Sequence, residues 1–365
     1  MALELWTPHE LYELRQDERN TPLPSYFLDT FFTNTYFSED QEIRFADLPE
    51  ADRYLAPFVL PYEQGKPLMF STKEDIKSFA PPYIKLKNAV RPTQAKSLRP
   101  SDVFRNGGNP PSLEERFNAR VAELTEKQVR AIRMREVWMA ARAFIDGQVV
   151  ISYDRDQGAD SPVVTLSFGR DAGHTVTKSS NYWSDPNTDI LGDIETWMNT
   201  MYLAYGGGSA AMLIVGAQVA LLFRRNVGVK AALDKNYRGN ESVSIDLGIM
   251  RTDRPLNYIG ELANGLSVWS YKDTVDVPNG SGGKTRVDIL HEKDVLLVAP
   301  GATGVRAYGA IYDVDAIDSG AALSTDIFGK MFDTKDPGER FVMHQSSPLP
   351  IPLYPNRTFK ARVLA

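Results

Sequence analysis

A short run, Gly-Ser-Gly-Gly, precedes Lys284 and Thr285, and this combination could bind a nucleotide phosphate and its magnesium ion. In a phosphate-binding loop, backbone N–H groups surround the phosphates while the lysine and the hydroxyl contact the phosphates and the metal. The spacing differs from that motif, because Pro278 stands where the first glycine is required. Apolar segments at 275–277 and 286–290 indicate two strands joined by a hairpin loop. A nucleotide-binding enzyme that uses Lys284 and Thr285 stays open as an alternative.

Three aspartates, Asp313, Asp315 and Asp318, have the spacing with which a calcium-binding loop begins. The glycine that such a loop needs for its turn is missing, and Ser324 occupies the position of the closing glutamate. We therefore expect no calcium site here.

Other catalytic groups are also absent from the sequence. The chain contains no cysteine, which excludes thiolate catalysis and disulfide bonds. No serine lies in a nucleophile-elbow pattern. The four histidines form no close metal-ligand pair: His9, His174, His291 and His344. We expect no catalytic, cofactor-binding or metal-ligating residue, no cofactor, and a protein that is not an enzyme.

The formal net charge of −6 over 365 residues argues against a dedicated nucleic-acid-binding protein. Basic residues nevertheless alternate with glutamates between positions 112 and 142: Arg116, Arg120, Lys127, Arg130, Arg133, Arg135 and Arg142. Either they contact neighbouring subunits, a scaffold or DNA, or they form ion pairs along a solvated helix face. The sequence shows no export signal and no apolar run long enough to span a membrane, and the lack of cysteine fits a reducing cytoplasm.

Those basic residues lie on the longest predicted element, a helix over residues 112–146. Ser112 and the glutamate three residues later form a capping box, and Gly147 follows the last turn. At 1.5 Å per residue, this spine helix would span roughly 50 Å. Strands expected at 149–153 and 163–168 suggest that the helix lies across a sheet.

The first 45 residues are predicted to form an arm. Thr7 and Glu10 form a capping box that starts a short helix, expected to run to about residue 16. Residues 26–37 contain six aromatic rings, which need a surface on this chain or on a neighbour to bury them.

A proline-rich excursion follows over residues 54–92, and its pattern predicts a long two-stranded hairpin. Its arms are expected at 68–70 and 83–86. Because such a hairpin is only marginally stable alone, we expect it to lie against this subunit or another one.

Residues 186–301 predict a mixed unit of helices and strands. Helices are expected at 188–205, 217–225 and 229–234, and strands at 210–215, 284–290 and 295–299. Asn264-Gly265 indicates a tight hairpin between 256–262 and 266–271.

From about residue 302 the chain is expected to return to the first unit. Residues 337–365 predict two extended strands joined by a bend that Pro348, Pro350, Pro352 and Pro355 keep out of any helix. A terminal strand orders the end of a chain inside a sheet, which is typical of a shell-building protein.

Several segments, in their order along the chain, resemble the lambda-type phage major capsid protein family, which has the Hong Kong 97 coat fold. They are Phe31-Phe32, Ala-Pro-Phe-Val at 56–59, Pro-Tyr-Ile-Lys at 82–85, residues 189–199, Gly-Val-Arg-Ala-Tyr-Gly at 304–309, and residues 336–349. The resemblance implies an α+β fold in five segments: an N-terminal arm (1–53), an extended loop (54–92), a peripheral domain (93–185, with the spine helix at 112–146), an axial domain (186–301), and the second part of the peripheral domain (302–365).

The resemblance also implies a function. Copies of the chain would form hexamers and pentamers of an icosahedral head that encloses double-stranded DNA and matures by expansion of a procapsid. The implied partners are further copies, a scaffold protein, a portal ring and a decoration protein, with non-specific contact to packaged DNA and none to a membrane. The implied location is the virion, and the host cytoplasm during assembly. A shell of the same fold that encloses cargo enzymes is the alternative.

Some relatives join a lysine of the extended loop covalently to a neighbouring subunit. Lys66, Lys73 and Lys77 are present here. The lambda-type branch instead uses a separate cementing protein, so the resemblance implies no crosslink.

Overall fold

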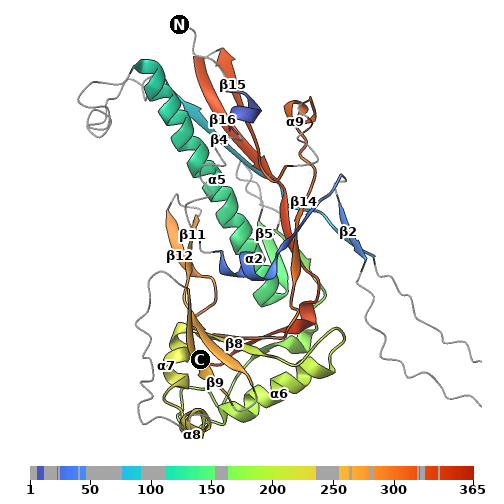
Figure 1. The fold of residues 1–365 in the computed structure, drawn as a ribbon, viewed down its shortest axis with the longest axis vertical. Coiled ribbons are helices and arrows are strands. Elements are labelled where there is room, and N and C mark those ends of the chain that lie inside the picture. Colours follow the sequence, from blue (N-terminus) through green and yellow to red (C-terminus); the bar gives the residue numbers. More distant parts are fainter. Residues whose placement is uncertain are drawn as a thin grey trace, which may run out of the picture.

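The computed structural model describes residues 6–11, 23, 25–39, 42–46, 76–91, 112–152, 163–235, 255–262, 265–278, 283–318, 320, 325–335 and 338–365. The molecule is elongated. A long helix, α5 (Leu113–Asp146), runs diagonally through its upper part, and a sheet with accompanying helices forms its lower end (Figure 1). Among the described helices, none is long and apolar enough to cross a membrane.

Helix α5 begins and ends where the sequence predicts. The Ser112 side chain accepts a hydrogen bond from the Glu115 N–H at 3.1 Å, and the Glu115 carboxylate accepts one from the Ser112 N–H at 2.7 Å. Gly147 follows in the left-handed conformation with φ of 67°. The next two strands, β5 (Gln148–Ser152) and β6 (Val163–Ser167), form an antiparallel hairpin. The predicted helix and strands are therefore confirmed.

A three-stranded antiparallel sheet packs along the N-terminal half of α5. Its order is β15 (Phe328–Lys335), β16 (Gly338–Ser346) and β4 (Ile84–Val90). The expected excursion arm at 83–86 thus pairs with β16, because its alternating apolar residues can then face α5 while its lysines face outward. The other expected arm, 68–70, and Lys66 and Lys73 lie outside the described residues.

A second three-stranded sheet lies near the C-terminal half of α5. Strand β14 (Gly304–Tyr308) pairs in parallel with β1 (Asn34–Phe37) and antiparallel with β17 (Pro348–Pro352). Three prolines fit in β17 because it is an edge strand, where a missing N–H can face away from the sheet. A separate two-stranded sheet pairs β2 (Ile43–Ala46) with β3 (Ile76–Phe79).

The largest sheet has the order β7-β18-β13-β8-β10-β9. Its strands are β7 (Thr175–Thr177), β18 (Thr358–Arg362), β13 (Asp294–Val298), β8 (Met212–Gly216), β10 (Ser267–Tyr271) and β9 (Leu256–Glu261). The helices α6 (Ile190–Leu203), α7 (Ala217–Phe223) and α8 (Val227–Lys235) lie with it at the lower end of Figure 1. The helices, the buried strand and the β9–β10 hairpin predicted for this region are confirmed.

The prediction for the chain end was wrong in two respects. Residues 338–362 form three strands, β16, β17 and β18, instead of two. The last of them does not return to the first unit with the others. It lies between β7 and β13 in the six-stranded sheet, where its alternate residues Phe359, Ala361 and Val363 enter the apolar core beneath α6.

The arm packs on its own chain through helix α2 (Tyr26–Phe31). Phe27, Phe31 and Phe32 are buried, and the Phe31 ring stacks on Phe144 of α5 at 4.0 Å between centroids. The Phe32 ring lies against Gly304, where a β-carbon would collide with it. In the first segment, residues 8–11 are helical, and Thr7 and Glu10 form the predicted capping contacts. The rest of that expected helix lies outside the described residues.

Candidate functional site

The lysine and threonine of the glycine-rich segment lie in a strand. Lys284 and Thr285 begin β12 (Lys284–Asp288), which pairs antiparallel with β11 (Thr274–Pro278). Both side chains are exposed, while the preceding run 279–282 lies outside the described residues. A phosphate-binding loop opens a helix, so this hairpin lacks the N-terminal helix dipole that such a site uses.

Two of the three aspartates of the calcium-like pattern, Asp313 and Asp315, already bind a cation from the chain itself. Asp313 precedes the short helix α9 (Val314–Asp318), and Lys330 Nζ lies 2.7 Å from its carboxylate and 2.8 Å from that of Asp315. Burial opposes ionisation of Asp313, but the hydrogen bonds from Lys330 and Gln345 outweigh it and lower the pKa of this carboxyl. Across the described residues, no group of three or more potential ligands could hold a metal ion.

The histidines lie apart. Nδ1 of the buried His174 is 3.1 Å from the carbonyl oxygen of Thr358, and Nδ1 of the buried His344 is 2.6 Å from the Gln128 side-chain oxygen. His291 is exposed and accepts a hydrogen bond from the Lys293 N–H. These contacts fix side chains within the fold.

A surface hollow of about 430 Å³ lies beside residues 309–312. Its lining residues are Glu42, Ala80, Pro81, Tyr83, Gly309, Ala310, Tyr312 and Ser347. Burial, and then the charge of Asp313, raise the pKa of Tyr83 to about 12, so its hydroxyl remains protonated at neutral pH. The lining thus offers one carboxylate and no basic partner for acid–base catalysis.

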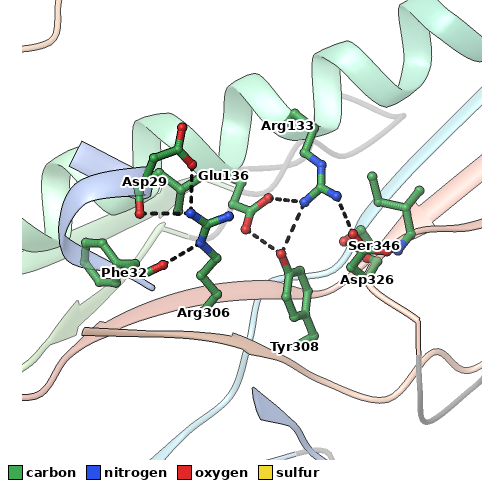
Figure 2. Close-up of polar contacts among 10 residues, drawn as sticks. Asp29, Phe32, Arg133, Glu136, Arg306, Tyr308, Asp326 and Ser346 are labelled. Atoms are coloured by element: carbon green, nitrogen blue, oxygen red, sulfur yellow. Dashed lines mark hydrogen bonds and ion pairs between the residues drawn. The ribbon is translucent and has the colours of Figure 1, made fainter. Parts of the chain in front are cut away.

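The most developed polar arrangement lies between α5 and β14, and we call it the spine cluster: Arg133, Glu136, Tyr308 and Asp326 (Figure 2). Glu136 is 1% exposed and accepts hydrogen bonds from the Tyr308 hydroxyl at 2.6 Å and from Arg133 Nη1 at 2.9 Å. Arg133 also binds Asp326 in the segment before β15. The cluster therefore joins the spine helix to two other parts of the chain.

Electrostatics keep the Tyr308 hydroxyl and the Arg133 guanidinium protonated. Burial, and then the nearby Glu136 carboxylate, raise the pKa of the Tyr308 hydroxyl, so it stays a hydrogen-bond donor. Burial alone would lower the pKa of Arg133, but the charges of Glu136 and Asp326 raise it. Each of these groups has a hydrogen-bond or ion-pair partner within the spine cluster, and such partners offset the cost of burying polar groups.

A neighbouring set of contacts holds the arm. Arg306 is two residues before Tyr308 on β14, and its side chain points toward α2 (Figure 2). Its guanidinium donates to the carbonyl oxygens of Phe32 at 2.6 Å and Leu28 at 3.1 Å, and to the Asp29 carboxylate at 2.8 Å. It therefore caps the end of α2, where it adds a second donor to the Leu28 carbonyl, which already accepts the Phe32 N–H, and binds the Phe32 carbonyl beyond the helix.

A further ionic cluster joins α5 to the six-stranded sheet. Asp294 of β13 is 1% exposed and binds Arg362 at 2.7 Å and Lys360 at 3.1 Å. Lys360 also binds Asp146 at the end of α5, at 2.7 Å. Arg142 completes the contact to Asp146 from one helical turn earlier, at 3.0 Å.

Most of the basic residues on α5 form ion pairs. The pairs within the helix are Arg120–Glu123, Lys127–Glu123, Arg133–Glu136 and Arg142–Asp146. Arg130 and Arg135 are exposed. The interpretation as ion pairs along the helix is therefore confirmed for these residues, but in the Arg133–Glu136 pair the glutamate is buried, so this pair does not lie on a solvated face.

Solved structures have this fold over nearly the whole chain. A crystal structure described as the putative capsid protein of a prophage from E. coli CFT073 is similar with a TM-score of 0.66 and 20% identity, covering 99% of this chain and all of that one. A phage-related protein from Bordetella bronchiseptica RB50 is similar with a TM-score of 0.50 and 9% identity, covering 99% and 98%. The expected α+β architecture of the Hong Kong 97 type is confirmed.

Sequence comparison identifies the family. The family described as phage major capsid protein E matches residues 12–363. The major capsid proteins of Escherichia phages lambda and N15 are each 25% identical, over 95% and 92% of this chain and 96% and 93% of their own lengths. The chain belongs to the phage major capsid protein E family. The interpretation as a coat subunit of a virion shell is confirmed and favoured over a cargo compartment.

Proposed function

We propose that many copies of this chain form the hexamers and pentamers of an icosahedral phage head that encloses double-stranded DNA. The observation that carries the proposal is the match to a capsid protein family over residues 12–363, together with one fold across that length. The head is built as a procapsid and expands when DNA enters. Its mechanism is repacking of subunit interfaces, without bond chemistry.

The proposed division of the subunit is an arm (1–53), an extended loop (54–92), a peripheral domain (93–185 and 302–365) and an axial domain (186–301). The axial domain is supported by the six-stranded sheet, because its strands β8, β9, β10 and β13 and the helices α6, α7 and α8 all come from residues 186–301. Since β18 pairs with β13, its residues are structurally part of the axial sheet. The cluster at Asp294 joins the end of α5 to the axial sheet, and the spine cluster joins the two parts of the peripheral domain, so together they hold each subunit as one body during assembly.

The proposed partners are further copies, a scaffold protein, a portal ring and a decoration protein, with assembly in the host cytoplasm. Non-specific contact with packaged DNA is supported by Arg130 and Arg135, which are exposed and have no ion-pair partner among the described residues. The net charge of −6 keeps this contact weak. We propose no enzymatic activity.

Expression of the chain, alone and with an adjacent candidate scaffold gene, tests the proposal. Negative-stain electron microscopy should show closed shells or curved sheets of hexamers. Heads from phage-producing cells should contain nuclease-protected double-stranded DNA. Protected protein cargo in place of DNA would favour a cargo compartment, and a small discrete oligomer under both conditions would refute the coat assignment.

A further inference from the structure

Three stretches of chain connect the part of the subunit around α5 with the six-stranded sheet, and we call them the neck: residues 168–174, 299–303 and 353–357. The first leads from β6 to β7, the second from β13 to β14, and the third from β17 to β18. They lie together near the lower end of α5 (Figure 1). The contacts of the neck therefore decide how firmly the helix is held relative to the sheet.

Arg170 fixes the end of α5 to the six-stranded sheet. Its guanidinium donates to the carbonyl oxygen of Ile145 in the last turn of α5 at 2.7 Å. It also donates to the hydroxyls of Thr175 on β7 at 2.7 Å and Thr358 on β18 at 3.4 Å. Gly147 makes room for this side chain, because a β-carbon there would lie 2.8 Å from it. One side chain thus joins the helix to two strands of the sheet.

Asn356 and Arg357 bind the three stretches of the neck to one another. The side chain of the buried Asn356 accepts the Asp171 N–H at 2.8 Å and donates to the Asp171 carboxylate at 3.1 Å. Arg357 Nη1 donates to the carbonyl oxygens of Gly301 at 2.9 Å and Pro300 at 3.3 Å. The neck is therefore a connected network of hydrogen bonds.

His174 is buried within this network, at the end of the 3₁₀ turn η2 (Ala172–His174). Its Nδ1 is 3.1 Å from the carbonyl oxygen of Thr358, so Nδ1 carries the proton of the neutral ring. Its Nε2 is also buried and has no hydrogen-bond partner among the described residues. The Phe359 ring packs beside it, with 5.7 Å between the ring centroids. A proton added at Nε2 would therefore be buried without an acceptor.

Two charged groups act on the His174 ring, Arg170 and Asp171. Burial has the largest effect and lowers the pKa of His174; the Thr358 carbonyl and the Asp171 charge act against it, and the Arg170 charge acts with it. The elements packed against η2 are β18 and α6. Their other charged side chains are paired or face away: Lys360 with Asp146 and Asp294, Arg362 with Asp294, Asp193 with Lys178, and Glu195 about 160° around α6 from the core residue Trp197.

We propose that the neck is a proton-sensitive joint, which holds α5 at one angle to the six-stranded sheet at neutral pH and loosens in mild acid when His174 takes up a proton. The unpaired Nε2–H and the repulsion from Arg170 both disfavour the closed neck. Local opening relieves both, because it exposes the ring to water. The inference goes beyond the proposed function, since it concerns a single subunit and requires no shell.

Hydrogen exchange of the full-length, unassembled chain tests the joint, with mass spectrometry at about pH 7 and about pH 5.5. Each exchange rate is divided by the rate of unstructured peptides at the same pH. Because the closed neck excludes the proton, its opening should increase by up to about tenfold per pH unit below the ordinary histidine value of about 6.5. The expected result is a loss of protection of that size at 168–178 and 353–360, with α6 and β8 unchanged.

His174→Asn is the test variant. Its side-chain amide can replace Nδ1 as the donor to Thr358 and does not titrate, so the neck should stay protected at both pH values. His174→Gln takes its place if the first variant does not fold. His291→Gln is the matched control, because this histidine is exposed and its replacement should leave the acid response unchanged.

An equal loss of protection at the neck in the His174→Asn variant and the unmodified chain would overturn the inference, because another group would then respond to acid. A loss spread evenly over α6 and β8 would show global destabilisation and would also overturn it. So would an unmodified chain whose neck stays protected. A loss confined to β16 would identify the other buried histidine, His344, as the responding group and would count against the neck.

Discussion

Removing the Tyr308 hydroxyl or the Glu136 carboxylate tests whether the spine cluster holds α5 on β14. Tyr308→Phe deletes one buried donor to a charged acceptor, and such a hydrogen bond contributes about 2 kcal/mol. Glu136→Ala leaves the proton of that hydroxyl without an acceptor and removes one carboxylate from Arg133, although Arg133 Nη1 still donates to the hydroxyl oxygen at 3.3 Å. Arg133 keeps Asp326 as a partner, so the expected loss is about 3 to 4 kcal/mol, near the lower end for breaking a buried pair. Because both changes remove the same bond, the double variant should cost about 2 kcal/mol less than the sum of the single variants.

The assay is urea unfolding of unassembled subunits, followed by tryptophan fluorescence and compared at equal protein concentration. Tyr312→Phe is the matched control, since this tyrosine is 53% exposed and its replacement should change stability by less than about 0.5 kcal/mol. A coupling energy between Tyr308 and Glu136 below about 0.5 kcal/mol would refute the reasoning, because the two groups would then act independently.

Four further predictions concern pH, a helix cap, arm packing and crosslinking. Burial lowers the pKa of His174, so the folded protein should lose stability as pH falls below the ordinary histidine value of 6.5. In thermal melts, His174→Gln should flatten that decline in stability. The control variant His291→Gln, at an exposed site, should leave the decline unchanged. Ser112→Ala removes the capping box and should cost about 1 kcal/mol in urea unfolding, and no loss would contradict the cap's role. Gly304→Ala places a methyl group against the Phe32 ring, so it should lower the free energy of unfolding by about 1 to 3 kcal/mol. The same variant should speed proteolysis of the arm. An unchanged proteolysis rate would show that the arm packs elsewhere. Boiling purified heads in detergent should release this chain as a monomer band at 40.8 kDa, and a ladder of its multiples would disprove the absence of crosslinks.

Local signals predicted the elements that depend on neighbours in the sequence. The start and end of α5 follow from Ser112 and Gly147, whose side-chain oxygen and left-handed backbone satisfy the helix ends. The turn that joins β9 to β10 follows from Gly265, which has a φ of 76°.

Pairings between distant segments were not predictable in the same way. An extended segment with alternating apolar residues, such as β18, can join any sheet with a free edge, and its place between β7 and β13 depends on chain segments 60 or more residues away. The Glu136–Tyr308 contact spans 172 residues and has no local pattern. One sequence feature did indicate that Glu136 has a partner. Glu136 lies in the apolar stripe of the helix between Ile132 and Ala140, where burying an unpaired charge would be costly.

The most direct test of the central claim is a cryo-electron microscopy reconstruction of the particles formed by this chain. The account predicts an icosahedral shell of hexamers and pentamers into which the subunit fits as one body, with α5 as a continuous rod. Particles without that symmetry, or a soluble oligomer with no closed wall, would contradict it.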